Sequence, residues 1–395
     1  MVDALGAELG VDTWQILVER AASAGFTRRG SVSCGGATHL VRAHDGWVAV
    51  SLARAADREL VPAWLEVDTD VRDVWATVVE VARNRSVGDL DDRAALLGLP
   101  VGVVPPMPGP DQRDDPPRCT AAEGRSTSPR RVADATHPFD GMPIGATVIG
   151  PPRRGRSGHP LVVDLSSLWA GPLCTRLLVD AGCRVVKVES TGRPDAARHG
   201  NRTFFDLLHA GKRSVALDFT DPSGRTALHR LVAAADVVVE ASRPRALRQL
   251  GVDASALLAA DSGPSVWVSI TARGRTGAAA NRVGFGDDVA AAAGLVVEDA
   301  EGPVFCADAV ADPLSGMVAA AAAQRAWRDG SRWLLNVAML DVASSAAGPT
   351  LDLPAGTATP APRPSPPRGT ARRFGADTAA VMAEAAARSA DRSRR

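Results

Sequence analysis

The sequence places one carboxylate where it can serve as a nucleophile. Asp312 and Pro313 stand directly before a long alanine-rich run. This pair is typical of a helix start, because an aspartate side chain accepts backbone N–H bonds from the first turn and proline is favoured at the first helical position. We therefore expect Asp312 to cap a helix that ends near Trp327. The helix dipole favours the ionised carboxylate there, and some enzymes use such a group in covalent catalysis, so both roles stay open.

The other chemically capable residues form no comparable set. Asp287 and Asp288 are a paired acid without a nearby histidine or third carboxylate, which indicates a solvated helix start rather than a metal site. His199 and His209 lack a serine or cysteine nucleophile nearby, so we expect surface residues. The cysteines never occur as C-x-x-C, which argues against both a zinc site and a disulfide framework: Cys34, Cys119, Cys174, Cys183 and Cys306.

Strands and helices alternate from residue 160 onward. The expected strands are 161–165, 183–189, 213–219, 236–240, 265–271 and 332–339, and the expected helices between them include 170–182, 221–235, 244–250, 254–260 and 287–295. Repeated βα units predict an α/β fold, a Rossmann-like doubly wound parallel sheet. Residues 164–172, after the first strand, contain neither G-x-G-x-x-G nor a Walker A sequence, which argues against dinucleotide redox and ATP chemistry.

The segment before this sheet predicts a smaller α+β domain. A helix over 11–25 precedes a small-residue loop at 33–38, and Asp45-Gly46 is a strong hairpin signal between two short strands. Helices are expected over 56–65, 71–83 and 90–98, with a strand over 99–104. The predicted division is 1–104 for this domain, 105–158 for a Pro- and Gly-rich linker, 159–347 for the Rossmann-like domain, and 348–395 for a Pro-rich tail with a helix at 376–389.

Composition sets limits on partners and location. The chain carries 45 basic and 45 acidic residues, a formal net charge of zero, so no global charge favours nucleic acid or an anionic membrane. The first residues lack a basic start followed by an apolar run, and no stretch offers about 18 uncharged apolar residues. We expect a soluble cytoplasmic protein without membrane or nucleic-acid partners.

Several runs together resemble a known family. VVDLSSLWAGPLCTRLLVDAGCRVVKVE, HAGKRSVALDF and DPSGRTALHRLVAAADVVVE are similar, in order and spacing, to the class III CoA-transferases, the formyl-CoA and carnitine CoA-transferase group. ADPLSGMVAAAAAQRAWRDG resembles the segment with that family's catalytic aspartate, and the match falls on Asp312. Residues 35–104 resemble the family's small domain, with its mobile glycine loop at Gly35-Gly36. That domain follows the Rossmann-like half in the family and precedes it here, so the order looks permuted.

The resemblance implies an acyl-CoA:carboxylate CoA-transferase with a covalent aspartyl intermediate on Asp312. Coenzyme A would be bound as substrate and acyl carrier, no metal would be needed, and the protein would form an interlocked homodimer. By the same resemblance the residues along the CoA path are Leu168, Trp169, Ala170, Lys187, Leu217 and Arg243.

Two alternatives stay open. Ala241 and Ser242 replace the Asn and Phe that usually follow the VVVE strand, which motivates a non-catalytic paralogue that serves as structural partner of an active transferase. An acyl-CoA racemase or isomerase is the other alternative. The related racemases pair their aspartate with an upstream histidine, and residues 283–288 contain none.

Overall fold

The computed structural model describes residues 1–68, 72–106, 138–150, 152, 159–260, 262–348, 362–363, 365–366 and 368–394. Most of the predicted linker (107–137, 151 and 153–158) and most of the Pro-rich tail (349–361, 364 and 367) lie outside the described residues. No described helix has the length and apolarity that a membrane crossing requires.

The large sheet has seven strands, and six of them run parallel. Its order is β4-β12-β9-β8-β5-β6-β7, and only β4 at the edge is antiparallel to its neighbour. Without β4, the chain order across the sheet is 3-2-1-4-5-6, the doubly wound Rossmann arrangement. The predicted α/β fold is confirmed. The strands are β4 Gly145–Gly150, β5 Leu161–Asp164, β6 Arg184–Ser190, β7 Arg213–Leu217, β8 Val237–Glu240, β9 Val266–Thr271 and β12 Arg332–Ala338.

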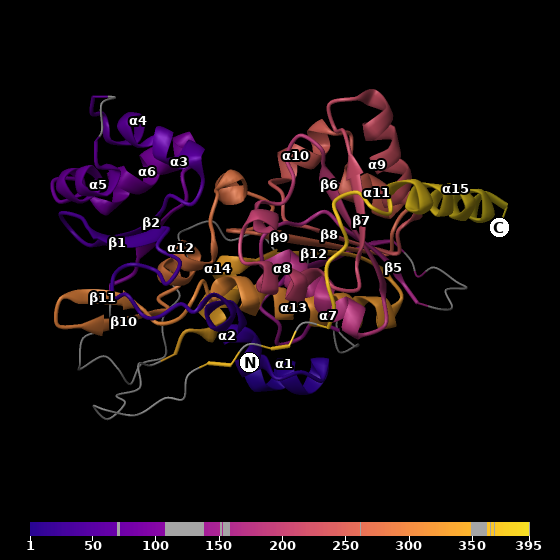
Figure 1. Cartoon of the computed structure of the whole chain (residues 1–395), viewed down its shortest axis with the longest axis horizontal. Coiled ribbons are helices and arrows are strands. Elements are labelled where there is room, and N and C mark those ends of the chain that lie inside the picture. The colour runs from indigo at the N-terminus through magenta and orange to yellow at the C-terminus, as the bar shows by residue number, and fades with distance from the viewer. Residues whose placement is uncertain are drawn as a thin grey trace.

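Helices cover both faces of this sheet (Figure 1). Strands such as β5 and β8 are continuous apolar runs, because parallel strands are buried on both sides. One face is covered by α7 Ala170–Asp180, α8 Arg202–His209, α13 Ala311–Asp329 and α14 Met339–Ala346. The other face is covered by α9 Pro222–Ala234, α11 Ala254–Ala259 and α15 Thr378–Arg394, with α10 Pro244–Gln249 beside them.

The helix α13 is central to the first face. Its alanine run is buried almost completely, as expected for a helix that is apolar all round. The small side chains allow close packing against α7. A Cβ on Gly316 would lie 2.7 Å from the carbonyl oxygen of Ala170, so the start of α7 lies directly against the first turns of α13.

A separate small sheet lies at the other end of the molecule (Figure 1). Its three antiparallel strands are β1 Thr38–Arg42, β2 Trp47–Ser51 and β3 Val101–Val104, and the predicted hairpin at Asp45-Gly46 is confirmed. Its own core includes Val48, Trp64 and Leu90. The covering helices are α3 Ala55–Glu59, α4 Val61–Leu65, α5 Val74–Ala82 and α6 Val87–Leu97.

Two N-terminal helices join the large core rather than the small one. These are α1 Val2–Leu9, which the sequence did not indicate, and α2 Thr13–Ala24, which was predicted. Leu5 and Ile16 belong to the same apolar cluster as α13. Asp12 caps α2 by accepting the N–H of Gln15 at 3.0 Å. The domain boundaries at residues 104 and 159 stay a prediction. Because α1 and α2 pack in the same core as α13, the N-terminal segment and the large domain share that helix.

The small sheet meets the large domain through α12 Gly286–Ala292 and the hairpin of β10 Val296–Asp299 and β11 Gly302–Phe305. On β3, a Cβ at Gly102 would lie 2.3 Å from the carbonyl oxygen of Asp288, so only glycine permits this approach. The result is a tight seam between α12 and the small sheet.

Candidate active site

Asp312 lies in the first turn of α13, at this seam. The helix begins at Ala311, and its N-cap is Val310, whose side chain makes no capping bond. The prediction that Asp312 itself is the cap is therefore wrong. Val310 already has helical backbone angles (φ −60°, ψ −23°), whereas a residue that caps with its side chain usually has extended ones. The helix therefore starts before Asp312, and the Asp312 carboxylate does not serve as its cap.

A glycine on α12 makes room for this carboxylate. A Cβ on Gly286 would lie 2.5 Å from Oδ2 of Asp312 and 2.3 Å from the carbonyl oxygen of Ala309. Both distances are far below any real contact, so α12 can approach Asp312 only with glycine at this position. The carboxylate is thus enclosed between the starts of α12 and α13.

Two further aspartates on α12 are buried beside it. Asp287 and Asp288 are 7% and 1% exposed, so the predicted solvated helix start is wrong. Asp287 accepts the N–H of Ala309 at 2.8 Å, and Asp288 accepts the hydroxyl of Ser51 at 3.0 Å. The small sheet covers α12 here, and this long-range packing leaves no trace in the local sequence.

Burial shifts the titration of this acidic group. It raises the pKa of Asp312 to about 7, an effect that Arg20 opposes and that Asp287, Asp288 and Asp308 increase. Burial likewise raises the pKa of Asp287 to about 6 and that of Asp288 to about 7. Neighbouring carboxylates with raised pKa values are common at functional sites.

Arg20 of α2 balances part of this negative charge, and sequence reasoning missed it. Its guanidinium binds Asp308 through two hydrogen bonds, of 2.8 and 2.5 Å. A Cβ on Gly35 would lie 3.1 Å from Nη2 of Arg20, so the predicted glycine loop lies against the same side chain. Nearly 300 residues separate the two partners of this ion pair, so no local pattern could have revealed it.

The turn after β5 lies at the switch point of the sheet. In the observed strand order the chain reverses direction between β5 and β8, and ligands of doubly wound sheets bind in the crevice at the carboxyl ends of such strands. Leu168 in this turn has a left-handed backbone (φ 70°), and the residue is 40% exposed. A strained backbone that presents an apolar side chain to solvent is suited to ligand contact.

Trp169 and Ala170 connect this turn to Asp312. Ala170 begins α7, whose start packs on α13, as described above. The Trp169 indole is buried against Phe204, at 5.1 Å between ring centroids, and lies 5.3 Å from the Arg20 guanidinium. Within the described part of the chain its N–H has no hydrogen-bond partner. The structure therefore places three of the predicted residues, Leu168, Trp169 and Ala170, in one turn whose end packs against the first turns of α13, the helix that carries Asp312.

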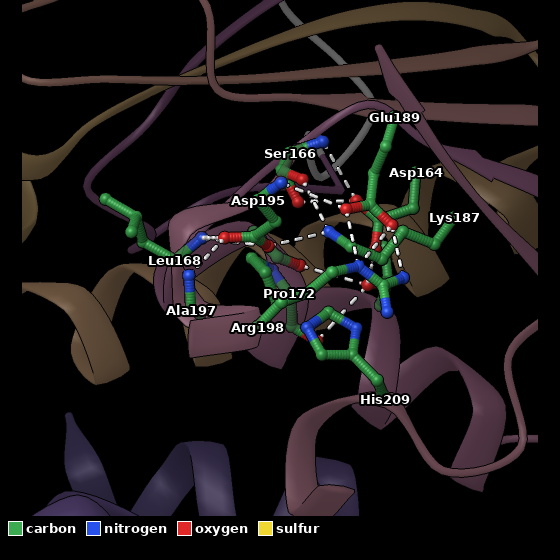
Figure 2. A network of polar contacts seen from close by, with 12 residues as sticks. Asp164, Ser166, Leu168, Pro172, Lys187, Glu189, Asp195, Ala197, Arg198 and His209 are labelled. Atoms are coloured by element: carbon green, nitrogen blue, oxygen red, sulfur yellow. Dashed lines mark hydrogen bonds and ion pairs between the residues drawn. The ribbon is translucent and has the colours of Figure 1, made fainter. Parts of the chain in front are cut away.

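Lys187 belongs to the polar network that reaches the Leu168 turn (Figure 2). The lysine is 2% exposed, and its ammonium donates to Asp195 at 2.8 Å and to the carbonyl oxygen of Ser166 at 3.0 Å. Asp195 in turn accepts the N–H of Leu168 at 3.2 Å. Lys187, expected from the resemblance as a CoA ligand, thus points into the protein and supports the turn.

A second buried lysine lies in the same network. Lys212 donates to Asp164 at 3.2 Å and to the hydroxyl of Thr175 at 2.7 Å, and burial lowers its pKa to about 8. His209 lies beside it at the end of α8 and is 2% exposed, so the predicted surface position is wrong. Burial holds the pKa of His209 well below its usual range, so this imidazole is neutral.

The last two predicted residues lie apart from Asp312. Leu217 ends β7, and its side chain is buried in the core beneath α9. Arg243 is exposed before α10, where burial and the nearby charges of Arg245, Arg54 and Arg193 lower its pKa. Three arginines thus act on Arg243, and a guanidinium suits phosphate oxygens.

The described residues contain no group of three or more histidine, cysteine, aspartate or glutamate side chains that could hold a metal ion.

Comparison with known proteins shows the family. The sequence profile of CoA-transferase family III matches residues 160–376, more than half of the chain. The chain belongs to CoA-transferase family III.

The similarity to individual relatives covers only part of this chain. It is 32% identical over 240 residues to the probable fatty acyl-CoA transferase Rv3272 of Mycobacterium tuberculosis, covering 57% of this chain and 61% of that protein. It is 33% identical over 132 residues to the succinyl-CoA–D-citramalate CoA-transferase of Chloroflexus aurantiacus, covering 32% of this chain and 33% of that protein. A CAIB/BAIF family protein from Brucella suis is similar in structure, with a TM-score of 0.44, 31% identity and coverage of 47% and 53%. The chain thus spans about one third to three fifths of these relatives' lengths.

Proposed function

We propose that this member of the family transfers CoA from an acyl-CoA thioester to an acceptor carboxylate, with Asp312 as the covalent nucleophile. The observation that carries the proposal is the position of Asp312. Its carboxylate caps no helix and lies in a seam that only glycine leaves open, and its helix packs against the start of α7, which follows the switch-point turn of the sheet. Relatives named as CoA-transferases of succinate, glutarate and citramalate support the reaction class.

The proposed transfer takes place in four steps, and each step exchanges one group at a carbonyl carbon. The Asp312 carboxylate attacks the thioester carbonyl, and the CoA thiolate leaves, which gives a mixed anhydride. The thiolate then attacks the aspartyl carbonyl and expels the donor carboxylate, which leaves an aspartyl-CoA thioester. The acceptor carboxylate attacks that thioester and expels the thiolate, which finally attacks the acceptor's acyl carbon and releases Asp312. Covalent catalysis thus divides one difficult transfer into easier steps.

The surrounding residues supply position and charge. The Leu168 turn, supported by Asp195 and Lys187, forms the wall of the CoA path, and the arginines around Arg243 meet the phosphates. The N–H of Gly36 is used within its turn, on the carbonyl oxygen of Ser33 at 2.8 Å. Gly35 is therefore the loop residue that we expect to donate an N–H to the oxyanion formed at each exchange.

Trapping of the aspartyl intermediate tests this function. The protein is incubated with a mixture of acyl-CoA donors, treated with hydroxylamine or borohydride, digested and analysed by mass spectrometry. We expect a modification on the peptide that contains Asp312, and none in Asp312→Asn or without donors. An unmodified peptide with every donor, together with unchanged activity of Asp312→Asn, would sink the proposal.

The same experiment separates the alternatives. A non-catalytic paralogue, favoured by Ala241 and Ser242 after β8, would bind an active transferase and yield no adduct. A racemase would exchange the α-proton of an acyl-CoA for deuterium without any adduct on Asp312. No histidine is among the groups that most strongly influence the Asp312 carboxyl, which favours the transferase over the racemase.

A further inference from the structure

The charge balance around Asp312 depends on a helix from the other end of the chain. The groups that act most strongly on its carboxyl are one cation, Arg20 of α2, and three carboxyls. Two of these, Asp287 and Asp288, are on α12, and Asp308 precedes α13. Since the three carboxyls oppose ionisation of Asp312, the single arginine has to offset them.

Arg20 is held rigidly enough to do this. Besides its two hydrogen bonds to Asp308, its guanidinium lies over the rings of Trp169 and Phe26, at 5.3 and 5.6 Å. Gly35 is packed against Nη2, as described above. An arginine fixed on three sides loses little further entropy when it acts as a counter-charge.

The helix that carries Arg20 is itself anchored to the large domain. Its neighbour Glu19 is buried and forms an ion pair of 2.8 Å with Arg176 of α7. Asn201 donates to the carbonyl oxygen of Ser23 at 2.9 Å, which fixes the end of α2 to the start of α8. The helix α2 lies outside the segment that matches the family profile, residues 160–376.

We propose that Arg20 is a positioning residue of the Asp312 site, supplied by α2 of the same chain, which fixes Asp308 and provides the positive charge against which Asp312 ionises. The inference deepens the proposed function and rests on it for its catalytic meaning. It assigns this counter-charge to the same chain that carries Asp312.

Titration of Asp312 tests the charge role of Arg20 without any acyl-CoA. This test can therefore fail while the proposed function holds, and it can succeed while the proposed function fails. Infrared difference spectra of protein with isotope-labelled aspartate identify the Asp312 carboxyl as the band absent from Asp312→Asn. In Arg20→Gln we expect its titration midpoint to rise by about one pH unit or more, the effect of losing a close opposite charge. Arg20→Lys keeps the charge and should restore most of the shift. Arg42→Gln, which removes an exposed arginine stacked on Trp47, should leave the midpoint unchanged.

A second variant covers the case in which Arg20→Gln fails to fold because Asp308 is left unpaired. The double variant Arg20→Gln/Asp308→Asn removes both partners, and the midpoint should still rise, because Arg20 influences the Asp312 carboxyl more strongly than Asp308 does. An unchanged or lowered midpoint in a folded variant overturns the proposal.

Mixed chains test the origin of Arg20. Co-expressed Arg20→Gln and Asp312→Asn chains, each with its own tag, are purified together and assayed with the acyl-CoA donors that label the wild type. If each site draws Arg20 from its own chain, the mixture is no more active than the separate variants. Recovery of activity in the mixture would show that a partner supplies Arg20 and would overturn the assignment to one chain.

Discussion

Asp312→Asn should make the protein more stable at pH 8 and no more stable at pH 4. Burial raises the pKa of the Asp312 carboxyl from 3.8 to about 7. Between these values the folded state binds a proton that the unfolded state has lost. The free energy of unfolding therefore falls as the pH rises through this window. Above pH 7 the native protein bears the whole cost of an ionised, enclosed carboxylate.

The size of this cost follows from the shift. At about 1.4 kcal/mol per pH unit, the difference corresponds to about 4 kcal/mol. Asp312 keeps some exposure to solvent, so we halve this figure to about 2 kcal/mol. Asparagine has nearly the same shape and carries no charge, so Asp312→Asn should gain about that amount at pH 8. At pH 4 the native carboxyl is protonated, and the gain should vanish.

Urea unfolding followed by tryptophan fluorescence, at both pH values, measures the effect. The control is Asp221→Asn, because Asp221 caps α9 by accepting the N–H of Ser223 at 2.8 Å and asparagine caps equally well. The control should change stability by less than about 0.5 kcal/mol at either pH. Destabilisation of Asp312→Asn at pH 8, or an equal gain at both pH values, would refute the argument that this carboxylate is held ionised at a cost.

Three more variants test other parts of the site. Lys212→Met leaves the Asp164 carboxylate in the core without its ion-pair partner, so it should lose about 3–5 kcal/mol in the same urea experiment. Gly286→Ala places a methyl group 2.5 Å from Asp312 Oδ2 and should lower kcat on the order of tenfold to a hundredfold in a transferase assay. Arg243→Ser removes one charge of the arginine cluster and should raise KM for acyl-CoA about tenfold, with kcat retained.

Each of these variants has a matched control or a contrary result. Gly192→Ala adds the same methyl group where no atom lies within 4 Å, and it should leave kcat unchanged. Arg248→Ser removes an exposed charge from the far end of α10 and should leave KM unchanged. If Gly192→Ala lowered kcat as much as Gly286→Ala does, the effect would not come from the position beside Asp312. If Arg248→Ser raised KM as much as Arg243→Ser does, the effect would not be specific to Arg243. Native stability of Lys212→Met would mean that Asp164 is not ionised in the core.

The large sheet was predictable because its signals are local. Each strand is a short apolar run, and caps such as Asp221-Pro222 mark the helices between them. The Asp-Pro pair already marked the aspartate at the start of α13, and the resemblance to the family assigned it the catalytic role. Its exact capping state was missed, because the backbone of Val310 depends on the turn that precedes it and not on the Asp-Pro pair.

The site's surroundings were not predictable, because distant packing decides them. Asp287 and Asp288 look like a solvated helix start until the small sheet covers α12. His209 looks like a loop residue until α8 buries it beside Lys212. Arg20 lies on an ordinary amphipathic helix, and nothing in residues 13–24 indicates that a carboxylate more than 280 positions away is its partner. Lys187 is a further example, because the local sequence of a lysine on a strand does not show whether its side chain reaches solvent or hydrogen-bonds to a buried turn.

The balance between burial and Arg20 also bears on the proposed chemistry. A fully solvated carboxylate is ionised at neutral pH, but it is a weak nucleophile because its basicity is low. A carboxylate buried beside three others is more basic, yet without a counter-charge it would stay protonated and unreactive. With a pKa of about 7, Asp312 retains a substantial ionised fraction near neutral pH while its basicity is raised by about three pH units. Enclosure by α12 and charge from α2 therefore act on the same carboxylate in opposite directions, and the proposed reactivity of Asp312 requires both.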